Sequence, residues 1–231
     1  QTEENLARKY QVTRAEQEKL AAASHQKAAA ARAAGKFKAE IVPIVLADGS
    51  TVSEDGCIRP ETTVEVLAGL APAFDADGSV TAGTSSPLTD GASATLVCTE
   101  EYAAKNNLEL IARVKSIAVA GCAPEIMGYG PVPATQKALA RAGVKADQLD
   151  VIEINEAFAS QAIVCIRDLH LDDSKINLDG GAIALGHPLG ATGARITGKA
   201  ASLLKREKGK YALSTQCIGG GQGIATVLER A

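Results

Sequence analysis

Aromatic residues are scarce in this chain of 231 residues: they make up 3% of it, and there is no tryptophan. The core must therefore be built from Ala, Val, Ile and Leu, and a chain of this length is long enough to bury a large share of its surface. Charge of one sign is not in large excess either, since the formal net charge is −3. We therefore expect no nucleic-acid or membrane-surface partner, because such partners require a clustered positive field. The sequence also has no apolar run of membrane-spanning length, and we expect no signal peptide.

The five cysteines are odd in number, and none of their spacings resembles CxxC. We therefore expect neither a disulfide framework nor a metal site, and a reducing compartment fits this pattern best. A free cysteine is usually buried and inert, and we predict this for Cys57, Cys98, Cys122 and Cys165. The chain begins with polar, helix-like sequence and no initiating Met, so we expect it to be part of a longer protein.

The first ninety residues combine one long helix with irregular sequence. A capping box at 13–16 predicts the start of an Ala-rich helix that continues to about residue 34 and ends at Gly35. A strand is predicted at 40–46 and a short helix at 63–70. Residues 75–91 are rich in Gly, Ser, Thr, Asp and Pro and predict a long loop, and such loops are often functional.

After residue 91, apolar β-like runs alternate with helical ones. We predict helices at 100–106, 134–142, 157–169 and 193–208. The predicted strands lie at 94–99, 110–120, 149–154, 211–217 and 224–228. Strands that alternate with helices indicate an α/β layered domain.

Three loops at the ends of predicted strands carry residues suited to chemistry, and open α/β sheets bind ligands at the carboxyl ends of their strands. The first loop begins with Asn155, directly after the strand predicted at 149–154. Asn155 either caps the helix that follows, or it fixes a water molecule or hydrogen-bonds a substrate carbonyl.

The second loop carries His187, one of three histidines, between Gly186 and Pro188. Glycine lets the backbone approach a ligand closely, and proline restricts the chain beside the imidazole. A histidine that titrates near neutrality can take and return protons, so this setting favours function over a purely structural turn. We predict that His25 and His170 lie at the surface, although His25 could instead contact a ligand.

In the third loop, Cys217 ends a predicted strand and is followed by the glycines at 219–221 and by Gly223. A dinucleotide fingerprint requires a helix after its glycines, whereas 224–228 predicts a strand, which disfavours an NAD(P)-binding module. Two alternatives remain for Cys217: a buried inert thiol, or a reactive thiol beside backbone amides. With His187 it would form either a nucleophile–base pair or two proton-transfer groups.

In their order along the chain, these loops resemble the C-terminal motifs of the thiolase family. The resemblance rests on NEAF at 155–158, GHPLG at 186–190 and CIGGG at 217–221. Residues 82–92 resemble the family's coenzyme A loop, and 3–5 resemble the segment ahead of its Ala-rich helix. The resemblance covers essentially the whole chain. Three segments most resemble the degradative 3-ketoacyl-CoA thiolases: 128–133, 165–169 and 221–227. These thiolases include the thiolase subunit of fatty-acid oxidation complexes.

The resemblance implies a layered fold of two similar βαβαβαββ halves, with a loop domain inserted in the first. Residues 1–88 would be the remainder of the loop domain, which binds CoA. Residues 89–108 would be the last strand and helix of the N-terminal half, and 109–231 the complete C-terminal half. The family's acylated nucleophile is a cysteine of the N-terminal half, and none of the five cysteines here lies in a matching motif.

The resemblance also implies roles for individual residues. His187 would activate the nucleophilic thiol, and Cys217 would protonate the acetyl-CoA enolate and later deprotonate CoA. Asn155 would hold a water molecule at the enolate oxygen, and the amide of Gly219 would bind the tetrahedral oxyanion. Ser86 and Arg59 match positions that contact CoA. Arg59 could equally be an ordinary surface arginine. Coenzyme A is a substrate, and the resemblance implies no permanently bound cofactor and no metal.

The predicted function is acyl transfer: thiolytic cleavage of 3-ketoacyl-CoA by CoA, giving acetyl-CoA and a shortened acyl-CoA, as in fatty-acid β-oxidation. The alternatives are a biosynthetic acetoacetyl-CoA thiolase and a non-catalytic, thiolase-like CoA or lipid carrier. The expected partners are acyl-CoA, CoA, the N-terminal thiolase half, further copies in a homodimer or tetramer, and the α subunit of a β-oxidation complex. The expected location is a bacterial cytoplasm, or a mitochondrion or peroxisome in a eukaryote.

Overall fold

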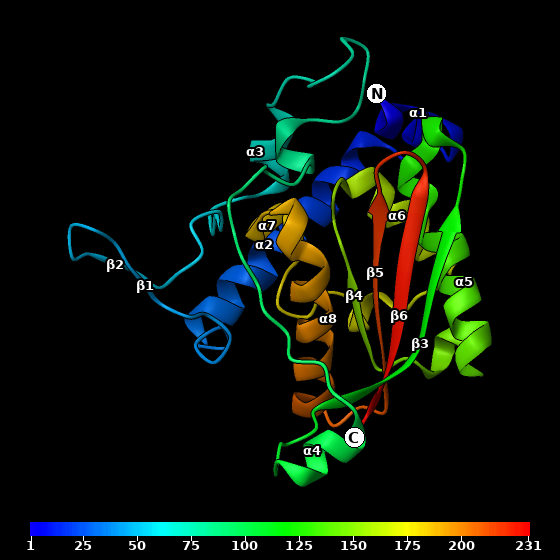
Figure 1. Ribbon diagram of the computed structural model, residues 1–231. Coiled ribbons are helices and arrows are strands. Elements are labelled where there is room, and N and C mark those ends of the chain that lie inside the picture. The colour runs from blue at the N-terminus through cyan, green and yellow to red at the C-terminus, as the bar shows by residue number, and fades with distance from the viewer.

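A mixed four-stranded sheet forms the centre of the computed structural model, which describes residues 1–231 (Figure 1). Its strands are β3 (Ala112–Gly121), β4 (Val151–Ile154), β5 (Tyr211–Ile218) and β6 (Gln222–Arg230), in the spatial order β3-β6-β5-β4. β4 and β5 are parallel, and β6 is antiparallel to both of its neighbours. The third strand expected for a βαβαβαββ half is reduced to one parallel bridge between Ile152 and Ile176.

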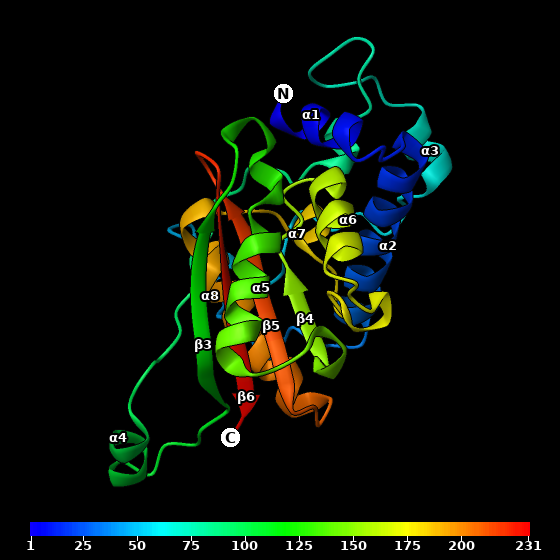
Figure 2. The same cartoon turned by 90° about the vertical axis from the view of Figure 1, so that its right-hand side faces the viewer.

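Helices cover both faces of this sheet. α5 (Pro131–Ala142) and α6 (Ala159–Asp168) pack on one face, and α8 (Leu189–Arg206) packs on the other. Figure 2 shows α5 in front of the sheet and α8 behind it. The apolar cluster on the α5 side includes Leu149, Ile152, Ile154, Leu213 and Val227. The cluster on the α8 side is Val151, Ala200, Leu203, Leu204, Ala212 and Leu228. These three layers confirm the predicted α/β layered domain.

The predicted Ala-rich helix is α2 (Arg14–Ala33), and its capping box is present. The Thr13 hydroxyl accepts the N–H of Glu16, and the Glu16 carboxylate accepts the N–H of Thr13 at 2.8 Å. α2 packs against α6 and against two short helices, α3 (Val64–Ala68) and α7 (Ala182–Leu185), of which α7 was not predicted. The first residues form α1 (Thr2–Lys9), and the short 3₁₀ helices are Ala82–Thr84, Pro124–Tyr129, Ala146–Gln148 and Asp173–Lys175.

Two predicted strands differ in the structure. Residues 94–99 form no strand, although the helix predicted after them is present as α4 (Glu100–Lys105). A strand requires a neighbour for its backbone N–H and C=O groups, and no strand of this chain lies beside 94–99. The strand predicted at 40–46 is only β1 (Ile44–Val45), which pairs with β2 (Thr51–Val52) in a hairpin that projects from the body (Figure 1).

Several side chains differ from prediction in their exposure. His25, predicted at the surface, is buried, because α2 packs its imidazole beneath the segment that carries Arg59. Of the four cysteines predicted to be buried, only Cys165 is; Cys57, Cys98 and Cys122 are partly exposed. No helix in the structure combines the length and the apolar character needed to cross a bilayer.

Burial of α1 against α6 gives a prediction about stability. Glu3 is 1% exposed, and burial raises the pKa of its carboxyl group from 4.5 to about 7, partly offset by a hydrogen bond from Ser160. The folded protein therefore holds a proton that the unfolded chain has already lost, and the free energy of unfolding falls as the pH rises from 4.5 to about 7. Each pKa unit corresponds to ~1.4 kcal/mol.

Glu3→Gln should flatten this part of the pH profile, as measured by urea unfolding between pH 4.5 and pH 7. Above this range the variant should be the more stable of the two proteins. Identical pH profiles for the two proteins would contradict the assignment.

Candidate active site

Asn155 lies directly beyond the carboxyl end of β4, where its N–H extends the ladder to the Thr215 carbonyl at 2.9 Å. Its side chain does not cap α6, since the cap position is Phe158 and no side-chain hydrogen bond is made there. Instead, Asn155 Nδ2 lies 3.3 Å from His187 Nε2. Asn155 is fully buried, and its Oδ1 has no hydrogen-bond partner. Buried polar atoms are normally paired, so Oδ1 marks a position for a donor such as a water molecule.

The hydrogen bonds around His187 define which ring nitrogen carries the proton. The Thr192 hydroxyl donates to the Pro188 carbonyl at 3.1 Å, so its oxygen accepts from His187 Nδ1, 2.7 Å away. Nδ1 is therefore the protonated nitrogen, and Nε2 presents its lone pair to Asn155. Burial, with a further contribution from the positive charge of Arg195, lowers the pKa of His187. The ring is thus a neutral base at pH 7, with Nε2 as the atom that accepts a proton.

Cys217 lies near the end of β5, the strand next to β4, and its thiol is partly buried. Burial, followed by the negative charge of Glu3, raises the pKa of Cys217 to about 12. The group is therefore a thiol at neutral pH, which is able to donate a proton and is a weak nucleophile. No hydrogen bond joins Cys217 to His187 or to Asn155.

The glycines after Cys217 form the turn between β5 and β6. Gly220 and Gly221 have φ values of +87° and +91°, which glycine adopts without strain. Gly219 is exposed, and the space where a Cβ atom would lie is open. The strand β6 follows this turn directly, and this confirms that the glycines are not a dinucleotide fingerprint.

Of the two residues predicted to contact CoA, only Ser86 lies against this site. The N–H and the hydroxyl of Ser86 both donate to the Ala157 carbonyl at 3.0 Å, so the 82–92 loop is fastened to the Asn155 loop. Arg59 is exposed, and its backbone N–H donates to His25 Nδ1 at 3.1 Å. No hydrogen bond or ion pair joins Arg59 to the other candidate residues.

Sequence reasoning missed two residues that support the site. Thr192 orients the imidazole, and the signal for it was a hydroxyl residue in the first turn of the helix after His187. Glu156 is buried beside Asn155, and the signal was a carboxylate between an apolar strand and an apolar helix.

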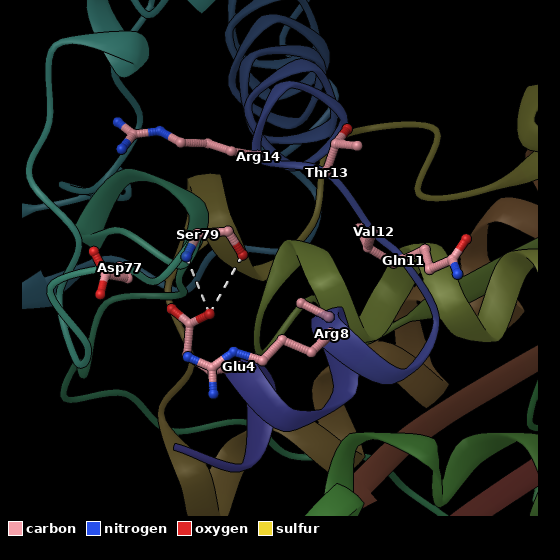
Figure 3. Close-up of a pocket in the computed structure, with 9 residues that line it drawn as sticks. Glu4, Arg8, Gln11, Val12, Thr13, Arg14, Asp77 and Ser79 are labelled. Atoms are coloured by element: carbon pink, nitrogen blue, oxygen red, sulfur yellow. Dashed lines mark hydrogen bonds between the residues drawn. The ribbon is translucent and has the colours of Figure 1, made fainter.

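A hollow of about 320 Å³ lies elsewhere, at the corner between α1 and α2. Figure 3 shows the Glu4 carboxylate there, accepting hydrogen bonds from the N–H and hydroxyl of Ser79 at 3.0 and 3.4 Å. None of the candidate residues lines this hollow.

Comparison with known proteins identifies two domain families. The thiolase C-terminal domain family matches residues 108–230, and the thiolase N-terminal domain family matches residues 1–101. A 3-ketoacyl-CoA thiolase of Vibrio vulnificus strain YJ016 is 55% identical over 99% of this chain and 61% of its own length. A 3-ketoacyl-CoA thiolase of Photobacterium profundum is 54% identical over the same shares, 99% and 61%.

Two crystal structures are similar over 100% of this chain. Human mitochondrial 3-ketoacyl-CoA thiolase in complex with CoA has a TM-score of 0.93 and 46% identity, with 58% of that chain covered. Bacillus anthracis acetyl-CoA acetyltransferase has a TM-score of 0.97 and 42% identity, with 59% covered. The chain thus spans about three-fifths of the proteins that it matches. With family matches along nearly its whole length, this chain belongs to the thiolase family.

Proposed function

We propose that this chain is the C-terminal portion of a degradative thiolase, which cleaves 3-ketoacyl-CoA with CoA to acetyl-CoA and a shortened acyl-CoA in fatty-acid β-oxidation. The observation that carries the proposal is the pairing of Asn155 Nδ2 with His187 Nε2 at 3.3 Å, while Thr192 occupies Nδ1. His187 Nε2 is therefore the one basic nitrogen of the ring, and it faces the buried side-chain amide of Asn155. Cys217 and Gly219 also lie at these ends of β4 and β5. The names of the relatives, 3-ketoacyl-CoA thiolases at 54–55% identity, favour cleavage over condensation.

In the first half-reaction, His187 Nε2 takes the proton of a nucleophilic cysteine outside this chain, and the thiolate attacks the 3-keto carbon. The Cα–Cβ bond then breaks, and its electron pair passes to the enolate of acetyl-CoA. Cys217 donates its proton to the Cα carbon of this enolate. Donors positioned where charge develops stabilise such intermediates. His187 and a water molecule held by Asn155 donate hydrogen bonds to the enolate oxygen, and the Gly219 amide donates one to the tetrahedral oxyanion.

In the second half-reaction, the Cys217 thiolate takes the proton of incoming CoA. The CoA thiolate attacks the acyl-cysteine, the shortened acyl-CoA leaves, and His187 returns its proton to the nucleophile. Coenzyme A is a substrate, and Ser86 and Arg59 contact it in this proposal. The bound CoA of the human relative's crystal structure supports a CoA site in this family member.

Two exposed apolar surfaces support a partner that covers this chain, namely the N-terminal thiolase half. Leu96 and Val97 are 78% and 75% exposed, in the segment that lacks a neighbouring strand. On β3, Ile117 and Val119 flank the buried Ala118, so they lie on the face of the sheet away from α5, and both are exposed. Apolar surfaces of this kind mark sites of association. The proposed boundaries remain 1–88, 89–108 and 109–231.

The β1–β2 hairpin exposes Ile44, Val45 and Val52, which supports self-association into a homodimer or tetramer. Five free cysteines suit a reducing compartment such as a bacterial cytoplasm.

The assigned roles predict the effect of two substitutions in a protein that contains both thiolase halves. His187→Ala and Cys217→Ser should each lower the rate of thiolysis by ~10²–10⁴-fold, the range for a lost acid or base. The assay is CoA-dependent cleavage of a 3-ketoacyl-CoA, with circular dichroism to confirm folding. Near-normal turnover in either variant would remove that residue from the mechanism. If the unsubstituted protein binds CoA but cleaves nothing, the carrier alternative is correct.

The tautomer assigned to His187 gives a second prediction. Thr192→Val leaves His187 Nδ1 without an acceptor, so kcat should fall by ~10–100-fold, as when the residue that orients a metal-binding histidine is replaced. Thr192→Ser keeps the hydroxyl and should retain most of the activity. Equal activity of the valine and serine variants would contradict the assigned role of Thr192.

A further inference from the structure

Glu156 has no part in the mechanism above, although it is adjacent to Asn155 and only 5% exposed. Its carboxylate accepts three hydrogen bonds: from the Ser24 hydroxyl at 2.6 Å, from Asn177 Nδ2 at 2.7 Å and from the Ile183 N–H at 3.2 Å. All three partners are donors, so the group acts only as an acceptor. A buried carboxylate persists only when its oxygens are paired in this way.

The three donors come from separate parts of the chain. Ser24 lies in α2, Asn177 follows the bridge of Ile176 to β4, and Ile183 lies in α7. Asn177 also pairs with β4, since its Oδ1 accepts the Ile154 N–H and its Nδ2 donates to the Ile154 carbonyl, both at 2.9 Å. The carboxylate therefore connects the end of β4, next to Asn155, to α2 and to α7.

The turn before α7 is shaped around this carboxylate. A Cβ atom at Gly181 would lie 2.2–2.4 Å from the carboxyl atoms of Glu156, so only glycine fits there. The Gly181 N–H donates to Ser24 Oγ at 3.1 Å, and Ser24 in turn donates to Glu156. Gly180, with a φ of +86°, approaches Ala28 of α2 in the same turn.

α7 is the four-residue helix that leads into His187. It runs from Ala182 to Leu185, and its Ile183 and Ala184 pack on alanines of α2. Gly186, with a φ of +91°, then turns the chain to His187. A displacement of α7 would therefore be passed to the imidazole over only a few residues.

From this geometry we infer that Glu156 is a positioning residue, which sets the distance between His187 and Asn155 by fixing α7 to the end of β4. This inference rests on the proposed function for its effect on turnover. Glu156 makes no hydrogen bond to His187 and takes no part in the proton transfers, so it acts through the α7 segment alone.

The test compares Glu156→Gln with Glu153→Gln in a protein that contains both thiolase halves. Glutamine at position 156 places an NH₂ group opposite one of the three donors, so the network must open. Glu153 is a matched control, because it lies on β4, three residues before Glu156, is 2% exposed and has a buried Oε1 without a partner. Glu156→Gln should lower kcat by ~10–100-fold at a nearly unchanged KM for CoA, whereas Glu153→Gln should keep kcat close to that of the unsubstituted protein.

A second readout is independent of turnover. In protein labelled with ¹⁵N-histidine, the His187 Nδ1–H donated to Thr192 should give a slowly exchanging resonance, which Glu156→Gln loses and Glu153→Gln keeps. Ser24→Ala removes one donor to the carboxylate and should change kcat and the His187 resonance in the same direction, but by less. This variant replaces Glu156→Gln in the test if Glu156→Gln does not fold.

Unchanged kcat and an unchanged His187 resonance in a folded Glu156→Gln or Ser24→Ala protein would overturn the inference. An equal loss in Glu153→Gln would overturn it as well, since any buried carboxyl group in or directly after β4 would then have the same effect. If the unsubstituted protein does not cleave 3-ketoacyl-CoA, the proposed function fails, and the His187 resonance alone decides the positioning role.

Discussion

The carboxylate of Glu156 is the contact on which the candidate site depends, because it is shared by segments that are distant in the sequence. Through its three donors, α2, the Asn177 turn and α7 meet at the end of β4. Removing one partner from such a buried network leaves the others unpaired, at a cost of ~1–3 kcal/mol for each group. The arrangement explains why a site at the sheet edge also requires a long helix from the first part of the chain.

The environments of His187 and Cys217 suit two different proton-transfer tasks. His187 has a lowered pKa and a fixed Nε2 lone pair, so it is a base that is neutral before the reaction. Cys217 has a pKa raised to about 12, so it is a thiol that holds its proton until a strongly basic carbon forms nearby. A thiol of this kind is a poor acyl acceptor, which agrees with a nucleophile located outside this chain.

Much of this structure could be predicted from the sequence, and the failures have physical causes. The capping box of α2 and the apolar runs of β4, β5 and β6 are local signals, and the elements formed where predicted. The strand at 94–99 did not form, because a strand depends on a neighbour and not on its own composition. The motifs predict Asn155, His187 and Cys217 as site residues, and the structure pairs Asn155 with His187. The contacts of Thr192 and Glu156 depend on distances between segments that periodicity does not reveal.

We propose that this chain supplies the proton-transfer groups of a thiolase, while the acyl group is carried elsewhere. The most direct test is to mix the two-half protein with a 3-ketoacyl-CoA in the absence of free CoA, quench with acid and map the acylated peptide by mass spectrometry. We expect the acyl group on a cysteine outside the 231 residues of this chain, with Cys217 unmodified. An acyl group on Cys217 would contradict the claim, because Cys217 would then be the nucleophile and not the proton donor.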